Sequence, residues 1–298
     1  FGAAHGGVWK TTDAGGNWRN VSDGFFEFPA VGALDVSRSD PDVVFAGTGE
    51  ALQRQFISPG DGVYKSTDSG ETWTNVGLRE TRHIAKLLIH PTNPDIVYVA
   101  AMGDMFGPNP DRGIYRTTDG GETWQRILYR GETTGAVDLT IDPANPRVLI
   151  AALNHHVTYP WDEESGGPTS GLFKTTDGGD TWTHIEGGVH PDIHGMAISP
   201  GEPNRVLAST PREIFATTDM GESWQSVVKT DRFPLPYSRG IAIKPDDPNV
   251  IYSAIGDSAF GSTGAIQRST DGGETWHSPV TPDAAGANGV AFDQLSDG

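Results

Sequence analysis

The chain has 298 residues, with 39 acidic and 21 basic side chains that give a formal net charge of −18, and it contains no cysteine. The charge disfavours nucleic acids and anionic membrane surfaces as partners, because both repel a negative protein. The lack of thiols excludes disulfide bonds and cysteine nucleophiles. No apolar run approaches the ~18 residues of a membrane span. No leader is visible, so we expect any leader to lie outside this chain.

One eight-residue pattern occurs six times, and Ser66 to Trp73 is a clear copy. The pattern is a hydroxyl residue, any residue, Asp, any residue, Gly, any residue, Ser or Thr, and Trp, with Asn17 as its one departure. The repeated aspartates lie between 42 and 58 residues apart and are Asp13, Asp68, Asp119, Asp177, Asp219 and Asp271. A repeat near fifty residues that is rich in strand and turn residues is typical of a four-stranded propeller blade.

The chemistry of the pattern predicts a structural role for the six aspartates. A short carboxylate such as Asp68 can accept hydrogen bonds from the backbone of its own turn. Gly70 can take the positive φ that a tight hairpin needs. Thr72 and Trp73 are then expected to start a strand, with the indole packed on a neighbouring sheet. We therefore interpret these acids as hairpin supports and not as catalysts.

Each repeat predicts the same four strands. The chain begins inside a repeat, with residues 1–4 as the end of a second strand. The clearest repeat then has an inner strand at 83–89, a turn at 90–95 where two prolines block the strand, and further strands at 96–101, 113–116 and 123–128. A last inner strand is expected at 289–292. We predict one domain over 1–298, an all-β, six-bladed β-propeller whose ring is closed by pairing of its N- and C-terminal strands.

The repeated pattern resembles the Asp-box, or BNR repeat, of the sialidase and sortilin-like superfamily of β-propellers. Runs such as 61–68, 81–84 and 93–100 look similar to secreted bacterial glycosyl-hydrolase-like repeat proteins. Four better-defined relatives match less well. Sialidases carry an Arg-Ile-Pro motif that is missing here, xyloglucan-cleaving enzymes have two tandem propellers, photosystem II assembly factors have an arginine-rich face, and sortilin-type receptors have larger rings and a cysteine-rich module. The resemblance implies a fold more firmly than a reaction.

The loops between second and third strands vary in length, and we expect them to share one face with the starts of the inner strands. Variable loops on a rigid scaffold commonly carry function. Candidate catalytic residues on this face are the acids Glu50, Asp104 and Asp257 and the bases His83 and His194. Candidate ligand-binding residues are His83, His155, Trp161, Arg212, Tyr237 and Arg239. The alternative interpretation is that these polar groups only hydrate the end of a channel.

Loop aromatics give this face a second feature. Trp161 stands outside the repeated motif, and Phe56, Phe106, Phe233 and Phe260 also fall in the predicted loops. Exposed rings beside carboxylates suit a sugar or a peptide, whereas rings folded back would only fill their own loops.

A divalent cation has no motif to support it, because no HxH or HExxH spacing occurs and the adjacent His155 and His156 are expected on opposite faces of a strand. We predict no cofactor. The leading hypothesis is a secreted or envelope propeller that binds a carbohydrate or extended polymer. One alternative is a glycoside hydrolase or lyase at the same channel mouth, and another is a protein-interaction scaffold.

Overall fold

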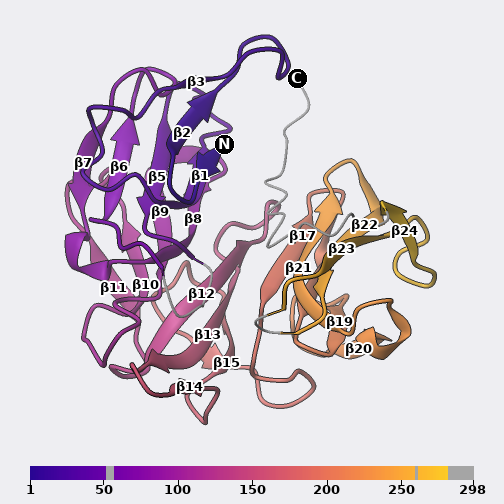
Figure 1. Ribbon diagram of the computed structural model, residues 1–298. Helices are drawn as coiled ribbons and strands as arrows, with labels where there is room; N and C mark the ends of the chain where they lie inside the picture. Colours follow the sequence, from indigo (N-terminus) through magenta and orange to yellow (C-terminus); the bar gives the residue numbers. More distant parts are fainter. Residues whose placement is uncertain (52–56, 259–260, 281–298) are drawn as a thin grey trace. The chain divides into compact units, whose positions relative to one another are not determined.

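The computed structural model describes residues 1–51, 57–258 and 261–280. All extended structure in this part of the chain is antiparallel β, arranged as six sheets (Figure 1). The described chain divides into two compact units. The first comprises residues 1–139, 153–169 and 177–182, and the second comprises 140–152, 170–176 and the described part from 183 onward.

The first three sheets follow the chain and have the orders β1-β2-β3, β4-β5-β6-β7 and β8-β9-β10-β11. Their strands are β1 (Gly2–Ala3), β2 (Gly7–Lys10), β3 (Arg19–Asn20), β4 (Val31–Val36), β5 (Val44–Thr48), β6 (Val63–Ser66), β7 (Thr74–Gly77), β8 (Ile84–His90), β9 (Asn93–Ala101), β10 (Gly113–Thr117) and β11 (Gln125–Leu128). A short 3-10 helix, η1 (Arg79–Thr81), precedes β8.

The remaining sheets have the orders β12-β13-β15-β16, with β14 paired to β13, then β17-β18-β19-β20 and β21-β22-β23-β24. Their strands are β12 (Thr134–Ile141), β13 (Leu149–Thr158), β14 (Glu163–Ser165), β15 (Gly171–Thr175), β16 (Thr183–His184), β17 (Gly195–Ser199), β18 (Glu202–Ser209), β19 (Glu213–Thr217), β20 (Gln225–Lys229), β21 (Tyr237–Lys244), β22 (Asp247–Gly256), β23 (Gly264–Ser269) and β24 (His277–Val280). The 3-10 helix η2 (Thr230–Arg232) follows β20.

The all-β class and the repeated four-stranded sheet are therefore confirmed. The second strand of a sheet is buried on both faces, as β5 and residues 97–101 of β9 show. The first sheet has three described strands, with β1 at its edge. The inner strand predicted for it at 289–292 lies outside the described residues, so the number of blades and the closure of the ring stay predictions.

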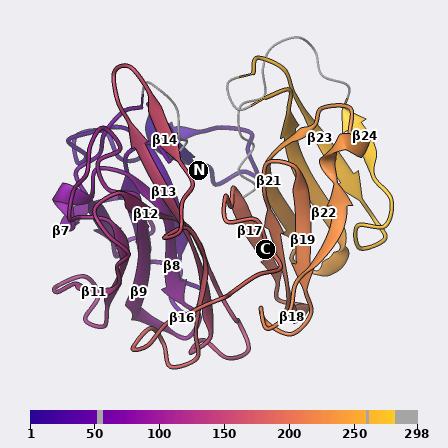
Figure 2. The ribbon, with the colours of Figure 1, turned by 90° about the horizontal axis from the view of Figure 1, so that it is seen from below.

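Three predicted boundaries are wrong. Residues 90–95 are not all turn, because His90 already pairs with Asn93 and β9 runs through Pro94. A proline is tolerated at the start of a strand, where its missing N–H leaves no essential bond unmade. The fourth strand begins after the motif tryptophan, since β7 starts at Thr74. Between the second and third strands of the fourth repeat we predicted only a loop, at 154–170, but this segment contains the β13–β14 hairpin, which extends as a separate arm (Figure 2).

The repeated turn has the predicted hydrogen bonds. The carboxylate of Asp68 accepts bonds from the hydroxyl of Ser66 at 2.7 Å and from the backbone N–H and hydroxyl of Thr72 at 2.8 and 2.6 Å. These bonds hold Thr72 in the turn, which explains why the strand starts later than expected. Gly70 has a φ of 84°, which a side chain would strain. The bonds from Thr72, and then from Ser66, hold the pKa of Asp68 at about 2.

Candidate functional site

In the first unit, the residues that follow β5 and precede β8 form a buried cluster. Glu50 is 2% exposed, and its carboxylate accepts a hydrogen bond from the backbone of Ser58 at 2.7 Å and lies 3.4 Å from Nε2 of His5. Nδ1 of His83 lies 3.1 Å from the Glu50 carbonyl. A carbonyl can only accept, so the proton of a neutral His83 is on Nδ1. The strand ends therefore bring Glu50 and His83 together, as predicted.

Burial determines the charge state of His83, which is 1% exposed. Desolvation lowers its pKa below the ordinary value of 6.5 and is the largest effect. The Glu50 carbonyl and the negative charges of Asp104 and Glu50 oppose this shift, while the cation of Arg112 adds to it. His83 is consequently neutral at neutral pH.

Arg112 lies at the centre of the loop that carries Asp104. Its side chain is 1% exposed and donates to the carbonyls of His156 at 2.8 Å, Thr133 at 3.3 Å, Asp104 at 2.6 Å and Gly107 at 3.2 Å. Burial lowers its pKa to about 10, and Asp104 opposes that shift. The guanidinium stays charged at neutral pH and fixes the loop through carbonyl oxygens.

The sequence interpretation missed Arg112 as a site residue, although a signal was present. The residue just before the glycine that opens a third strand is buried in several repeats, as at Asp61 (4%), Arg112 (1%) and Ser170 (3%). Asp61 bonds the hydroxyl of Tyr64 at 2.6 Å and the guanidinium of Arg79 at 2.9 Å. A charged residue at that position is therefore part of the framework under the loops.

Asp104 is half-buried and remains accessible at the end of β9. Its Oδ1 accepts from the backbone N–H of Phe106 at 2.9 Å. Phe106 itself is 49% exposed. Asp104 is therefore the more accessible of the two acids that sequence analysis placed in this unit, since Glu50 is enclosed by its own loop.

The β13–β14 hairpin carries one histidine–glutamate pair on each face. Nε2 of His155 lies 3.4 Å from Glu164, and Nδ1 of His155 lies 3.0 Å from the hydroxyl of Thr133. On the other face, Nδ1 of the buried His156 lies 3.6 Å from Glu163. The two rings have different partners because neighbouring strand residues point to opposite faces, as predicted.

Trp161 lies in the turn of this hairpin and is 81% exposed. Its ring stacks on Tyr159, with 5.7 Å between the centroids and 11° between the planes. Backbone bonds in both directions between Tyr159 and Asp162 close the turn. The structure thus presents an indole to solvent on an ordered two-stranded arm, next to the carboxylates of Glu163 and Glu164.

The second unit holds another predicted group. Nδ1 of His194 donates to the Ser238 carbonyl at 2.6 Å, and its Nε2 lies 3.4 Å from the Tyr237 hydroxyl and 3.5 Å from Asp192. The Arg239 guanidinium lies 5.1 Å from the centre of the Tyr237 ring. Both Tyr237 and Arg239 belong to β21. Arg239 lies near the start of an inner strand, as predicted, whereas Tyr237 is a strand residue and not a loop residue. Both still lie beside the start of β17, where His194 was predicted.

The other candidates are less organised. Arg212 and Asp257 are exposed, and Oδ1 of Asp257 accepts from the adjacent Ser258 backbone at 3.0 Å. Phe233 is 7% exposed and belongs to a core cluster, so it is not an exposed loop aromatic. Phe56 and Phe260 lie outside the described residues. Among the described residues, no group of three or more histidines or acids is placed to hold a metal.

Comparison with known proteins places the chain in a family. The profile of Sortilin-Vps10, described as sortilin, neurotensin receptor 3, matches residues 61–191 and 170–284. The chain belongs to the Sortilin-Vps10 family. The match supports the sortilin-like part of the superfamily that the sequence analysis named.

Curated relatives of this Sortilin-Vps10 chain are xyloglucanases. Xyloglucanase Xgh74A of Acetivibrio thermocellus is 26% identical and aligns with 91% of this chain and 35% of the enzyme. A xyloglucanase of Paenibacillus sp is 24% identical and aligns with 91% of this chain and 29% of the enzyme. The chain therefore spans about a third of the length of the curated relatives that it matches.

A solved structure shares the fold. The GH74 xyloglucanase from Xanthomonas campestris has a TM-score of 0.67 and 15% identity, over 93% of this chain and 42% of the enzyme. Xyloglucan-cleaving enzymes had been set aside because they contain two tandem propellers. The comparisons instead name them as relatives, and they favour the hydrolase alternative over the binding hypothesis.

Proposed function

We propose that this chain is a β-propeller of a glycoside hydrolase that acts on a neutral β-glucan of the xyloglucan class. Support comes from the two xyloglucanases that align with 91% of the chain. The observation that carries the proposal is the Tyr159–Trp161 stack on the β13–β14 hairpin, with its indole 81% exposed. An indole exposed to that extent adds little to folding, and its face is suited to stack on the C–H face of a sugar ring.

Charge is consistent with a neutral polymer. With a formal net charge of −18, the protein repels polyanionic polysaccharides. A neutral glucan has no such penalty, and its hydroxyls can both donate to and accept from the carboxylates and histidines of the hairpin. Because xyloglucan-type polymers are found outside cells, the proposal places the protein in the envelope or the extracellular space. Among the described residues, no helix is long and apolar enough to span a bilayer.

Hydrolysis of a glycosidic bond needs one carboxylic acid that protonates the leaving oxygen and a second carboxylate that activates water or attacks the sugar. In the first unit we assign a proton-transfer role to Asp104, because it is half-buried at a strand end whereas Glu50 is enclosed. In the second unit Asp257 is the exposed candidate. His83 is neutral and next to Glu50, so we assign it to positioning the loop.

The experiment compares turnover and binding on the same samples. Xyloglucan is incubated with the protein, new reducing ends are counted, and binding is measured by affinity electrophoresis. Asp104→Asn keeps an acceptor for the Phe106 N–H and is expected to reduce turnover at least a hundredfold while binding persists. Its matched control is Asp111→Asn, in the same loop. Equal turnover in both variants would remove Asp104 from the reaction.

Trp161→Ala tests the aromatic platform. Loss of stacking is expected to weaken xyloglucan binding about tenfold, on the order of 1 kcal/mol or slightly more. The control is Trp18→Ala, which removes an indole that is 44% exposed in a repeated turn. If Trp18→Ala weakens binding and Trp161→Ala does not, the hairpin is not the glucan platform.

A second function is favoured by the enclosed state of Glu50, which is 2% exposed and bonded by Ser58. With one candidate acid unavailable, the chain would bind the polymer without cleaving it. Binding of xyloglucan that depends on Trp161, with no reducing ends formed by wild type, would establish this function. Absence of both binding and turnover would favour the protein-interaction alternative.

A further inference from the structure

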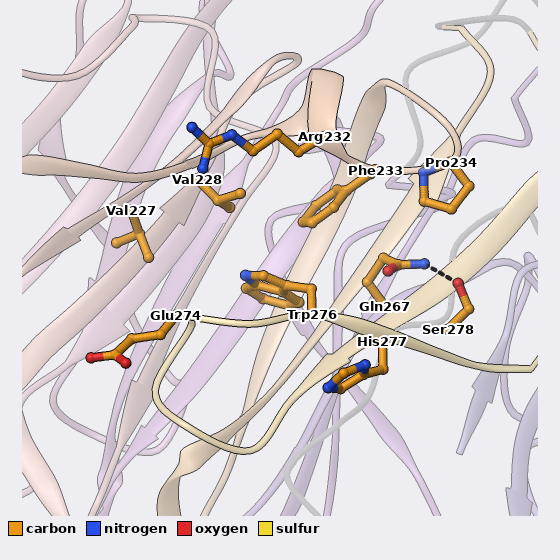
Figure 3. A pocket seen from close by; sticks show the side chains of 10 residues that line it. All are labelled: Val227, Val228, Arg232, Phe233, Pro234, Gln267, Glu274, Trp276, His277 and Ser278. Carbon is orange, nitrogen blue, oxygen red and sulfur yellow. Dashed lines mark hydrogen bonds between the residues drawn. The ribbon is translucent and has the colours of Figure 1, made fainter.

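The second unit contains a cavity of ≈ 610 Å³ at the outer strands of two sheets. Its lining comes from β20, the segment that follows β20, β23, the last repeated turn, and β24 (Figure 3). None of the candidate catalytic or ligand-binding residues lines it, although Phe233, one of the aromatics predicted in the loops, does. His194 and Arg239 lie at the opposite, inner edge of the same sheets. A volume of this size is in the range of small-ligand sites.

An aromatic surface forms the middle of the cavity. Trp276 is half-buried and meets Phe233 edge-on, with 5.3 Å between ring centroids. Its indole N–H is already bonded to the Gly273 carbonyl at 2.9 Å. The polar end of the ring is thus satisfied by its own turn, and part of the ring packs on the core of the unit. A ligand can contact only the part of the ring that lines the cavity. Figure 3 shows Trp276 among polar side chains, with Glu274 and Gln267 on opposite sides of it.

The polar groups around Trp276 include both donors and acceptors. Arg232 and His277 are exposed residues of the lining that can donate, and Glu274 is an exposed residue of the lining that can accept. Gln267 is 2% exposed, and its Nε2 donates to the hydroxyl of Ser278 at 2.6 Å. One arginine offsets one glutamate, so the lining is close to neutral although the chain is strongly acidic. A ligand with many hydroxyls and no charge matches this surface better than an ion does.

We infer that this cavity is a second glucan-binding site, which holds a few sugar units of a neutral β-glucan against Trp276. The choice of glucan rests on the proposed function, whereas the cavity and its lining do not. A site at the outer edge of the sheets would hold the polymer on the protein between cleavage events. It would do so without contact with the residues assigned to proton transfer.

The probe is cellotetraose, a neutral β-glucan fragment, titrated into the ¹⁵N-labelled protein. The chain has eight tryptophans, so each indole N–H gives its own signal. We expect the Trp276 signal to shift and saturate. Arg232→Ala and Glu274→Gln change exposed side chains and should each weaken this titration about tenfold. The matched control is Glu122→Gln, which changes the exposed glutamate at the same position of another repeated turn and should leave the titration unchanged.

The outcomes separate this inference from the proposed function. If xyloglucan is cleaved while the Trp276 signal stays fixed, the cavity is not a glucan site and the proposed function stands. If cellotetraose shifts Trp276 in a way that Arg232→Ala weakens, but no polymer is cleaved or bound through Trp161, the cavity inference stands alone. An extended peptide that shifts Trp276 where cellotetraose does not would overturn the inference. An equal loss of affinity in Glu122→Gln would overturn it as well.

Discussion

Arg116 and Asp180 form an ion pair of 2.9 Å that joins a third strand to the repeated turn of the following repeat. Nη1 of Arg116 also donates to the carbonyl of Gly178 in that turn at 2.8 Å. The arginine directly precedes the hydroxyl residue of its own motif. The same position holds Lys10, Lys65 and Lys174, which reach forward to the next turn at Glu71, Gly120 and Glu222. A basic residue before the motif therefore ties one repeat to the next.

Removing Arg116 and removing Asp180 should lower the free energy of unfolding by different amounts. Arg116→Ala removes a side chain that is 16% exposed, together with its bond to the Gly178 carbonyl, and should lower the free energy of unfolding by ~1 kcal/mol. Asp180→Ala removes a carboxylate that is 65% exposed and leaves the carbonyl bond in place, so its cost should be less than half of that. Urea unfolding measures both. A loss in Asp180→Ala as large as that in Arg116→Ala would show that the ion pair, and not the carbonyl bond, forms the tie.

The repeated turn should lose stability in acid. Bonds from Thr117 and Thr123 hold the pKa of Asp119 at about 2, below its ordinary 3.8. A carboxyl with a lowered pKa stabilises the folded state above the ordinary value and loses that effect as the pH falls to its folded pKa. Asp119→Ala should therefore melt a few degrees below wild type near neutral pH, and the difference should shrink below pH ~4. Glu122→Ala in the same turn is the control, and a constant difference at every pH would contradict the assignment. Activity per folded molecule should be unchanged in Asp119→Ala.

His83 should also make stability fall with falling pH, but in a window nearer to neutral pH than that of Asp119. Burial lowers the pKa of His83 in the folded state. Below pH ~6.5 this histidine is therefore protonated in the unfolded chain while it is still neutral in the folded one. Stability from this residue is complete above that pH and declines as the pH falls. His83→Asn keeps a donor for the Glu50 carbonyl and should flatten the decline between pH 7 and 5. His190→Asn, at an exposed histidine, should leave the wild-type profile. Parallel profiles for wild type and His83→Asn would contradict this role.

Closure of the ring can be tested by asking which residue of the predicted last strand lies opposite Ala3. If the first sheet repeats the pairing of β21 with β22, where Gly240 lies opposite Ala254, then Gly289 should lie opposite Ala3. The natural chain has no cysteine, so Ala3→Cys with Gly289→Cys introduces a single pair at a separation that a disulfide can span. We expect it to form on mild oxidation of the folded protein. Ala3→Cys with Asp293→Cys, four residues out of register, should not. Equal yields would argue against the closed six-bladed ring.

The fold was accessible from the sequence because its repeat combines several independent signals. Each Asp–Gly–Trp turn fixes one hairpin, and the continuous apolar run at 96–101 identifies the strand that is buried on both faces. The β13–β14 hairpin was missed for a physical reason. Both of its strands carry polar residues on both faces, with His155 facing Glu164 on one side and His156 facing Glu163 on the other. Without a known partner strand, such a polar segment looks like a loop.

The site was predictable only where a residue after one second strand lies beside a residue before the next inner strand. His83 beside Glu50 followed from that rule, whereas the Ser238 carbonyl that His194 contacts was not predicted. Arg112 did not follow from the rule either, because its four carbonyl partners lie on segments as far as 44 residues away, and nothing in the local pattern marks them. The cavity at Trp276 was missed because its tryptophan belongs to a repeated turn that had been interpreted as purely structural.

The contacts from each basic residue to the next repeated turn also affect how such a chain could gain or lose repeats. A repeat counted from one basic position to the next contains both a turn that receives a cation and the cation that the following turn receives. A gene duplication of one such repeat would therefore insert a unit that fits at both ends, without any compensating change in its neighbours. The fifth repeat has Ala216 at the basic position, and there Arg205 of β18 donates to the Gly272 carbonyl at 2.6 Å instead. At this repeat the receiving turn keeps its bond to a cation, although the cation comes from a different strand.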